Sequence, residues 1–418
     1  MTKLKENYLN HLKSISFRND SFINIDQTYF PEEENTKEPG SYILRDISSV
    51  PDVIRAVELI LSNRFILKLP SDKFPPKSFE NMFSLPEYSD GWNDILKDRL
   101  IYFRGQSNTE FNSVTPSLYR NKELFINENS IFLESTLASA NSLTGKSIFE
   151  QLALLQHYGQ ATRILDITSN LLVALFFAVS DNMDKDGEIY LYDFKEANLT
   201  PKVFNDIEVI VKATLTTLSL KEKYYLYEFI YNINSKDRYN DIKEYISYNS
   251  LKVTPCLKRI IDKLYANVLK ENGGNYISFN DLCGISLVLP NQTDERIIRQ
   301  SGCFILYGIE LFINKFKYYL FDNEKDLSDD GFKSIQKQAN TQLNQGLINY
   351  SPEQNIFEKS HFPSSGYSKI IIPHKYKKNI LLELEVLGIG QQSIYPDIVH
   401  KNLHIRKKYN HPENWGYN

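Results

Sequence analysis

The order of apolar and polar residues along the chain predicts a central β-sheet with helices around it. Short aliphatic and aromatic runs are typical of strands, and they lie at residues 100–104, 163–168, 188–194, 285–290 and 303–311. Segments between them have apolar residues about every three to four positions, as on one face of a helix. We therefore expect an α+β fold with a mixed central sheet surrounded by helices.

Changes in composition divide the chain into three expected parts. Residues 1–90 form an N-terminal arm and helix, residues 91–400 contain the predicted strands, and residues 401–418 are a basic tail. Within the middle part, residues from about 196 to 278 mix Lys, Glu, Tyr and Asn with helical apolar spacing. We expect a mostly helical insertion there. A strand, a turn and a helix are expected at residues 367–390.

Residues typical of helix ends flank several predicted helices. Ser and Asn favour the position before a helix, Pro favours its first turn, and Gly favours the position after its end. The expected caps are Ser48 or Ser49 before Pro51, Ser169 or Asn170 before residue 171, and Asn291 before a short helix. The expected ends are Gly159, after a helical pattern at 123–158, and Gly302.

Composition and charge exclude several classes of protein. The 48 Lys and Arg residues against 52 Asp and Glu residues give a net charge of −4, so no global field attracts nucleic acid or anionic lipid. Nucleic-acid binding then requires a local patch. The apolar run at 171–179 is too short to cross a bilayer. Three cysteines without a CxxC pair favour neither a disulfide framework nor a zinc site, so we expect a cytoplasmic protein without a membrane partner.

Several catalytic motifs are absent from the sequence. It contains no GxxxxGK[ST], GxGxxG, HExxH or GxSxG pattern, which disfavours P-loop phosphoryl transfer and zinc hydrolysis. His400 and His404 are four residues apart but lack a third ligand nearby in the sequence, so we expect no metal site. A nuclease is disfavoured because no cluster of metal-binding carboxylates accompanies Asp166.

Polar side chains are dense in the otherwise apolar segment 154–170. They are His157, Tyr158, Thr162, Arg163, Asp166, Thr168, Ser169 and Asn170. Polar groups in apolar surroundings must be paired or must meet a ligand. One interpretation is a structural network in which Asp166 holds Arg163, Thr168 caps a helix and His157 bonds a carbonyl. The other is a functional site.

Two further groups of residues are candidates for the same site. Arg104 and Gln106 end a predicted strand, and a guanidinium there suits phosphate or carboxylate, with Arg163 as a second positive charge. Arg296 and Gln300 are one helical turn apart and share a face, with Glu295 on the neighbouring flank. A salt-bridge partner for Arg104 and a solvated face for the second group are the alternatives.

Four stretches together resemble the FRG-domain family, which is named for its Phe-Arg-Gly motif. They are YFRGQS at 102–107, PSLYR at 116–120, LLQHYGQATRILDITSNLLVALFFAV at 154–179 and RQSGCF at 299–304. IYPDI at 394–398 resembles the closing segment of the family. Gln160 and Ala161 stand where the family often has Leu-Pro. The family is bacterial and viral, and the resemblance identifies the domain without settling its reaction.

The order of Arg104, the DITS run at 166–169 and Glu295 or Gln300 also resembles ADP-ribosyltransferases, which use NAD. That resemblance implies that Arg104 binds pyrophosphate or ribose and that Glu295 or Gln300 orients a ribose hydroxyl. It implies that Thr168 and Ser169 shape the nicotinamide pocket, and that His157 or Asp166 accepts a proton. The expected cofactor-binding residues are Arg104, Gln106, Tyr158, Thr162, Arg163, Thr168 and Ser169, and the expected catalytic residues are His157, Asp166, Gln300 and Glu295.

Two functions follow as hypotheses. The first is an enzyme that binds a nucleotide such as NAD and transfers ADP-ribose to a macromolecule, in an effector or anti-phage role. The second is a non-catalytic sensor or interaction module that binds a phosphorylated small molecule and reports through the helical insertion. Both need Arg104, His157, Arg163, Asp166 and Gln300 in one cleft.

Overall fold

The computed structural model of the 418-residue chain describes most of the segment between residues 100 and 395 and a shorter part before it. The described residues are 24–25, 43–45, 47–54, 56–57, 100–109, 115–194, 199–231, 233, 237, 240–251, 253–289, 291, 295–309, 321–323, 326–344 and 367–395. Most of the expected arm, the whole basic tail and the pair His400 and His404 therefore lie outside the described residues.

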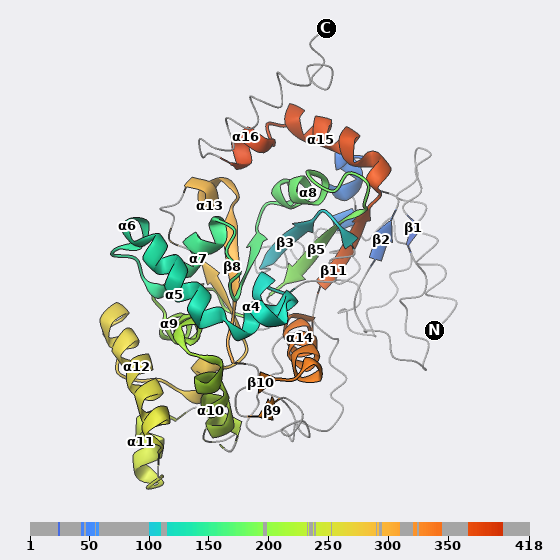
Figure 1. The fold of residues 1–418 in the computed structure, drawn as a ribbon. Helices are drawn as coiled ribbons and strands as arrows, with labels where there is room; N and C mark the ends of the chain where they lie inside the picture. The colour runs from blue at the N-terminus through green and yellow to red at the C-terminus, as the bar shows by residue number, and fades with distance from the viewer. Residues whose placement is uncertain are drawn as a thin grey trace, which may run out of the picture.

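A mixed sheet of nine strands forms the centre of the described structure (Figure 1), in the order β1-β2-β11-β5-β3-β4-β8-β7-β6. The β6–β7 and β2–β11 pairs are parallel, and the other pairs are antiparallel. The expected strands are β3 (Ile101–Gln106), β4 (Ile164–Thr168), β5 (Gly187–Asp193), β7 (Ile285–Leu289) and β8 (Gly302–Tyr307). The predicted α+β fold is confirmed.

Further strands extend the sheet at both edges. They are β1 (Asn24–Ile25), β2 (Ile43–Arg45), β11 (Tyr367–Ile372) and β6 (Lys202–Val203). The strand expected near residue 367 is β11, and it pairs with β5 from Tyr367 to Ile372. A separate two-stranded sheet consists of β9 (Phe321–Asn323) and β10 (Asp326–Leu327).

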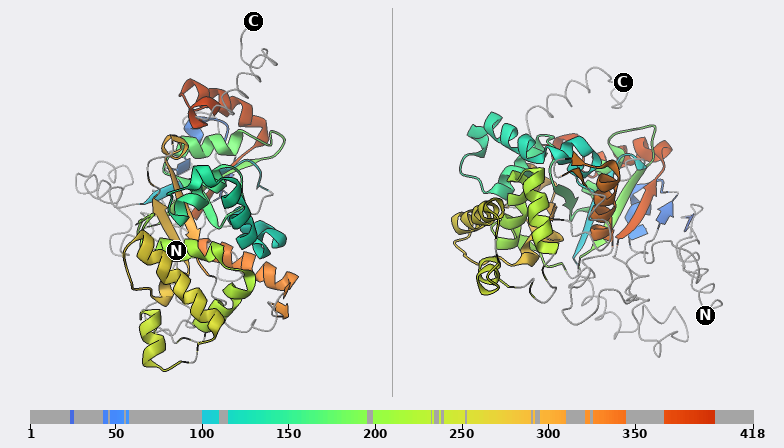
Figure 2. Two further views of the ribbon diagram at one scale, coloured as in Figure 1. Left: turned by 60° about the vertical axis from the view of Figure 1, so that its left-hand side comes forward. Right: turned by 60° about the horizontal axis from the view of Figure 1, so that its bottom comes forward.

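Helices cover both faces of the sheet (Figures 1 and 2). On one face, α8 (Leu171–Val179) and α15 (Lys377–Val386) pack on β3, β5 and β11. On the same face, α7 (Ile148–His157) and α9 (Ile207–Thr214) pack on β4, β7 and β8. The face is shared because Phe103 of the first group pairs with Thr168, and alternate side chains of β4 point the same way.

The opposite face has its own buried layer. Its helices are η5 (Ser117–Arg120), α4 (Lys122–Ile126) and α14 (Asp329–Asn344). Tyr119, Phe125 and Phe332 pack there against strand residues such as Leu165 and Tyr307. The strands β5, β3, β4, β8 and β7, which are successive neighbours in the sheet, therefore have buried side chains in both layers.

The expected insertion is mostly helical and has its own core. It contains α9, the 3-10 turn η6 (Leu215–Thr217), α10 (Leu220–Tyr231), α11 (Ile242–Tyr248) and α12 (Pro255–Glu271). Leu226, Leu264 and Phe279 are buried in that core, the last from η8 (Phe279–Leu282). Because α9 also packs against α7, the insertion is fused to the sheet layer. Among the described residues, no helix is long and apolar enough to cross a membrane.

Several predicted helix ends are confirmed. The Asn170 side chain accepts a hydrogen bond from the Leu172 amide at 2.9 Å and caps α8. Gly159 follows α7 with a φ of +89°, which a residue with a side chain rarely adopts. Ser49 accepts a hydrogen bond from the Asp52 amide at 3.4 Å, at the start of the helical residues that begin at Val50.

One local prediction is wrong, and another is divided more finely than the sequence indicated. The helical pattern at 123–158 forms four helices: α4, α5 (Glu128–Ala138), α6 (Ala140–Leu143) and α7. It breaks because Ser147 caps α7 in a capping box with Glu150, which fixes a new helix start. At the other position Gly302 begins β8, and Ser301 takes the positive φ, +46°, after α13 (Glu295–Arg299).

Gly105 is required by the packing of α8 on the sheet. A Cβ atom at this position would lie 1.7 Å from the Ala174 carbonyl oxygen of α8. Gly187 on the neighbouring strand is in the same situation, 2.2 Å from the Ala178 carbonyl oxygen. The helix backbone therefore lies directly on β3 and β5.

Candidate functional site

The sheet opens between β3 and β4. These strands pair only at Phe103 and Thr168, whereas continuing that register would place Gly105 opposite Asp166. In place of a ladder bond, the Arg104 side chain crosses the gap, and its Nη1 donates to the Asp166 carbonyl oxygen at 2.6 Å. The gap lies between the two groups of helices on this face, and residues of α7 and α8 line it. Arg104 enters the gap from the opposite face, since it pairs with Tyr190 of the opposite layer.

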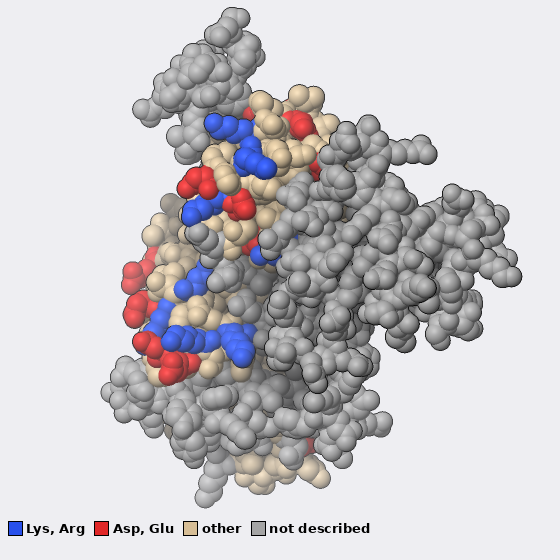
Figure 3. All heavy atoms as spheres, turned by 90° about the vertical axis from the view of Figure 1, so that its right-hand side faces the viewer, with Lys and Arg blue, Asp and Glu red and all other residues tan. Residues whose placement is uncertain are grey.

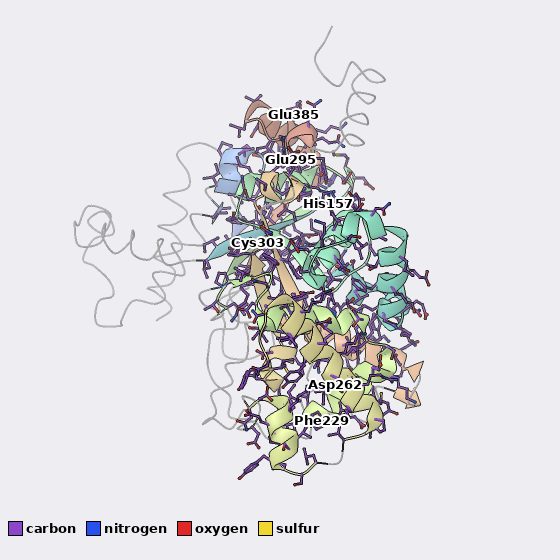
Figure 4. All side chains as sticks on the ribbon, turned by 90° about the vertical axis from the view of Figure 1, so that its left-hand side faces the viewer. His157, Phe229, Asp262, Glu295, Cys303 and Glu385 are labelled. Atoms are coloured by element: carbon purple, nitrogen blue, oxygen red, sulfur yellow. The ribbon has the colours of Figure 1, made fainter. Side chains whose placement is uncertain are left out.

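A cavity of about 200 Å³ occupies this gap, and we call it the central cavity. Its walls come from β3, α7, β4, α8, α13 and β8. The lining residues are Phe103, Arg104, Gly105, Ala153, Gln156, His157, Asp166, Ile167, Thr168, Phe177, Arg296, Ile297, Gln300, Gly302, Cys303 and Phe304. Figure 4 shows His157, Cys303 and Glu295 in the upper half of the molecule, far from Phe229 and Asp262 of the insertion.

Arg104 has an incomplete set of hydrogen-bond partners. Its Nε atom is buried and has no hydrogen-bond partner, and no carboxylate of a described residue forms an ion pair with its guanidinium. A buried donor without an acceptor is rare in folded proteins. The charge of Arg120, whose guanidinium donates to the Thr115 carbonyl, acts on the same region, because the pKa of Arg120 responds to both Arg104 and Asp166.

Asp166 is the one carboxylate among the residues that line the central cavity. It is exposed at the middle of β4, and its carboxylate forms neither a hydrogen bond nor an ion pair with any residue in the described part of the chain. Its backbone carbonyl is held by Arg104. The side chain is therefore available to a ligand.

Helix α13 closes the cavity on the far side from Arg104. Arg296 donates from Nη1 to the His157 carbonyl oxygen at 3.2 Å, so it connects α13 to the end of α7. The Gln300 carbonyl accepts a hydrogen bond from the Thr168 hydroxyl at 2.6 Å, which connects α13 to β4. The prediction that Arg296 and Gln300 share a face is confirmed, since both line the cavity.

Cys303 lines the cavity without being a nucleophile. Burial raises the pKa of its thiol to about 11, and the hydrogen bond to Tyr102 lowers that value only in part. The thiol is therefore protonated near neutral pH, and only a thiolate attacks efficiently. The described residues contain no group of three or more His, Cys, Asp or Glu side chains placed to hold a metal ion.

Five of the predicted site residues come together in the structure. They are Arg104, His157, Asp166, Thr168 and Gln300. They arrive from four elements that are distant in the sequence, β3, α7, β4 and the turn after α13. Their grouping is an observation of this structure, and the chemical role of each stays a prediction.

Arg163 does not reach the central cavity. Its Nε donates to Glu128 Oε1 at 2.6 Å, and its Nη1 donates to the Tyr307 carbonyl at 3.0 Å. Arg163 and Glu128 are each 2% exposed, and Lys223 of α10 also pairs with Glu128. Because Arg163 and Asp166 are an odd number of residues apart, they point to opposite faces of the sheet, and the proposed pairing of the two was wrong.

Other predicted residues also lie outside the cavity lining. The Gln106 amide nitrogen donates to Glu188 and to the Asn108 carbonyl, and Thr162 donates to Gln156, so both act in buried structural networks. Tyr158 is 72% exposed at the end of α7. The remaining two residues are exposed. The Ser169 hydroxyl lies beside the Ser301 carbonyl oxygen, and Glu295 Oε1 lies 3.9 Å from Arg299 Nη2.

Some residues around the cavity were missed in the sequence analysis. Gln156 and Phe177 line the cavity and lie in the FRG-like stretch at 154–179. Their helical spacing is the same as that of core residues, so it did not identify them as site residues. Arg120 belongs to the quoted PSLYR stretch, and Tyr395 belongs to IYPDI. Their proximity depends on tertiary packing, which no local pattern in the sequence reports.

Comparison with known proteins gives one match. A family model described as the FRG domain matches residues 99–187. This segment contributes Arg104, His157 and Asp166 to the central cavity, whereas α13 and β8 lie beyond it. No curated protein and no solved structure matches the chain.

Proposed function

Because residues 99–187 of this chain are an FRG domain, we propose that the domain binds a phosphate-bearing nucleotide in the central cavity and, with NAD as that nucleotide, transfers ADP-ribose to an acceptor. The family match supports the domain, and the cavity chemistry supports the ligand class. An effector or anti-phage role is proposed on the family resemblance alone.

The observation that carries the proposal is the incomplete bonding of Arg104. A guanidinium that is partly withdrawn from water is usually paired with a carboxylate or phosphate, because desolvation of its charge must be offset. The Nη1 atom of Arg104 donates to a neutral carbonyl oxygen, and its Nε atom has no hydrogen-bond partner. A phosphate oxygen would give this guanidinium an anionic partner through a charge-assisted hydrogen bond.

The charges around the cavity favour an anion. Arg104 and Arg296 line it, and Asp166 is the one carboxylate in the lining. On the one face shown in Figure 3, Lys and Arg side chains of the described residues are interspersed with Asp and Glu. Because the net charge of the chain is −4, no global field adds to the attraction of the cavity for an anion.

The volume limits how much of a nucleotide is enclosed. A space of about 200 Å³ is smaller than the roughly 300–1,000 Å³ typical of sites that enclose drug-sized ligands. The cavity therefore fits one part of a dinucleotide, such as a phosphate with its ribose, with the remainder lying across the opening.

Asp166 is the residue best placed to assist the transfer. In this reaction the bond between ribose C1′ and the nicotinamide nitrogen breaks, and both electrons leave with nicotinamide. A carboxylate next to the positive charge that develops on the ribose stabilises that transition state. The acceptor nucleophile bonds to C1′ and loses a proton, which we assign to His157. Glu295, the alternative carboxylate, lies outside the cavity lining.

The test is turnover of NAD by purified full-length protein. We expect nicotinamide release or label transfer from NAD carrying a labelled adenylate. Asp166→Asn is expected to lower the rate by at least about tenfold, as loss of a transition-state charge interaction does. Glu295→Gln is the matched control, because it removes an exposed carboxylate outside the cavity, and its rate is expected to equal that of the wild type.

The outcomes separate the two functional hypotheses. Saturable NAD binding without release of nicotinamide would contradict the enzyme hypothesis. It would support the hypothesis of a sensor that binds NAD in the same cavity. Equal turnover by wild type and Asp166→Asn would overturn the role of Asp166. Absence of both binding and turnover would remove the proposed function altogether.

A further inference from the structure

We infer that the segment from Gln391 to Tyr395, which lies outside the FRG match, is part of the nucleotide site, with Tyr395 acting as the positioning residue for Arg296. This inference rests on the proposed function. It assigns α16 (Gln391–Ile394) and Tyr395 to the layer directly behind the lining residues Arg296, Gln300 and Phe177. It also makes the ligand phosphate the group that Arg296 is positioned to meet.

Tyr395 holds the Arg296 guanidinium directly. The guanidinium carbon lies 4.5 Å from the centroid of the Tyr395 ring, a cation–π contact. The Tyr395 hydroxyl also forms a hydrogen bond with Arg296. On its other side Arg296 donates to the His157 carbonyl. The cation is thus fixed between an aromatic ring and the carboxyl end of α7.

The same segment also contacts the turn after α13 and helix α8. The Gln300 side-chain amide donates to the Ile394 carbonyl at 3.4 Å, and the Tyr395 ring meets the Phe177 ring edge to face at 6.2 Å between centroids. Phe177 and Gln300 both line the cavity. Tyr395 therefore packs against α8 and α13, and both helices contribute residues to the cavity lining.

Positioning matters because α13 is a short helix with little support of its own. It spans Glu295–Arg299, and none of its residues is buried. A long arginine side chain loses rotamer freedom when it binds an anion, and that loss weakens binding unless the side chain is already ordered. The Tyr395 ring orders Arg296 before the ligand arrives.

The experiment measures affinity for inorganic pyrophosphate and for NAD by isothermal titration with the full chain. Variants are Tyr395→Leu, Tyr395→Phe, Arg296→Gln and the double variant Tyr395→Leu with Arg296→Gln, each checked by its melting temperature. We expect Tyr395→Leu and Arg296→Gln each to weaken binding by about fivefold to tenfold. Tyr395→Phe keeps the ring face and is expected to lose less than Tyr395→Leu.

The double variant distinguishes positioning from a general structural effect. If Tyr395 acts through Arg296, adding Tyr395→Leu to Arg296→Gln lowers affinity little further. Equal losses from Tyr395→Leu with and without Arg296 would overturn the inference, as would unchanged binding by a folded Tyr395→Leu protein. If the wild type binds neither pyrophosphate nor NAD, the proposed function fails first and the inference fails with it.

Discussion

Arg104 and Arg163 both lie in stretches that resemble the FRG-domain family, but the groups that surround them differ. Arg163 is enclosed by Glu128, Lys223 and the Tyr307 carbonyl. Arg104 lies at the opening of the sheet and has no carboxylate partner among the described residues. The first is therefore a structural ion pair that connects α5, β4 and α10, and the second is the residue available to a ligand.

This contrast predicts losses of stability of different size. Arg163→Gln is expected to lower the free energy of unfolding by about 3–5 kcal/mol, because it leaves a buried charge on Glu128 with one partner fewer. Arg104→Gln is expected to cost about 1 kcal/mol, the value of one hydrogen bond. Urea denaturation measures both. Equal losses would contradict the separate roles assigned to the two arginines.

The pH dependence of stability tests Glu128. Burial raises the pKa of this carboxyl, but Arg163 and Lys223 lower it further, so the result falls from 4.5 to about 2. A carboxyl whose pKa is lower in the folded state stabilises the fold above its unfolded pKa and loses that effect as the pH falls toward the folded value. The stability gap between wild type and Glu128→Gln should therefore shrink between pH 4.5 and 2. A constant gap over that range would contradict this account.

At the scale of elements, the contact of α8 with β3 determines where the cavity forms. The backbone of α8 lies on Gly105 and Gly187, and the apolar side chains of α8 fill the space above β3 and β5. Beyond Phe103 the next strand, β4, diverges from β3. Helices cover the strands on either side of this gap. Within the gap, the Arg104 side chain donates to the Asp166 carbonyl oxygen and leaves space beside it. This space is the central cavity.

Gly105→Ala tests the close contact. A methyl group would lie 1.7 Å from the Ala174 carbonyl oxygen, so either α8 or β3 must move. Overpacking of this kind costs about 1–3 kcal/mol or more. Gly302→Ala is the control within a strand, since the nearest atom to its Cβ would be 3.5 Å away. Thermal unfolding should show a clear loss for Gly105→Ala and a small one for Gly302→Ala, and equal losses would refute the packing argument.

At the scale of the whole molecule, local patterns predicted the elements but not their partners. The strands with apolar runs and the Asn170 cap were predicted because strand burial and capping depend on neighbouring residues. The Arg163–Glu128 pair was not, because Glu128 lies in a segment whose helical spacing gives no information about partners elsewhere in the chain. The contacts of Tyr395 with Arg296 join residues far apart in the chain, and such contacts depend on the complete fold.

The grouping in the cavity shows the same limit. The FRG resemblance named Arg104, His157 and Asp166, and these residues line one cavity. It also named Arg163, Thr162 and Tyr158, which do not. A motif records which residues recur together, and it does not distinguish a residue that faces a ligand from one that supports the sheet beneath it. The tertiary structure makes that distinction, as for Arg163 and Asp166, which point to opposite faces of the sheet.

The most direct test of the central claim is titration of NAD into full-length protein and into Arg104→Gln, with the melting temperature of each measured beforehand. We predict saturable one-site binding to the wild type and at least about tenfold weaker binding to a folded Arg104→Gln protein, the loss expected for a charge-assisted contact to phosphate. Equal affinity in the two proteins, or no binding to the wild type at millimolar NAD, would contradict the account.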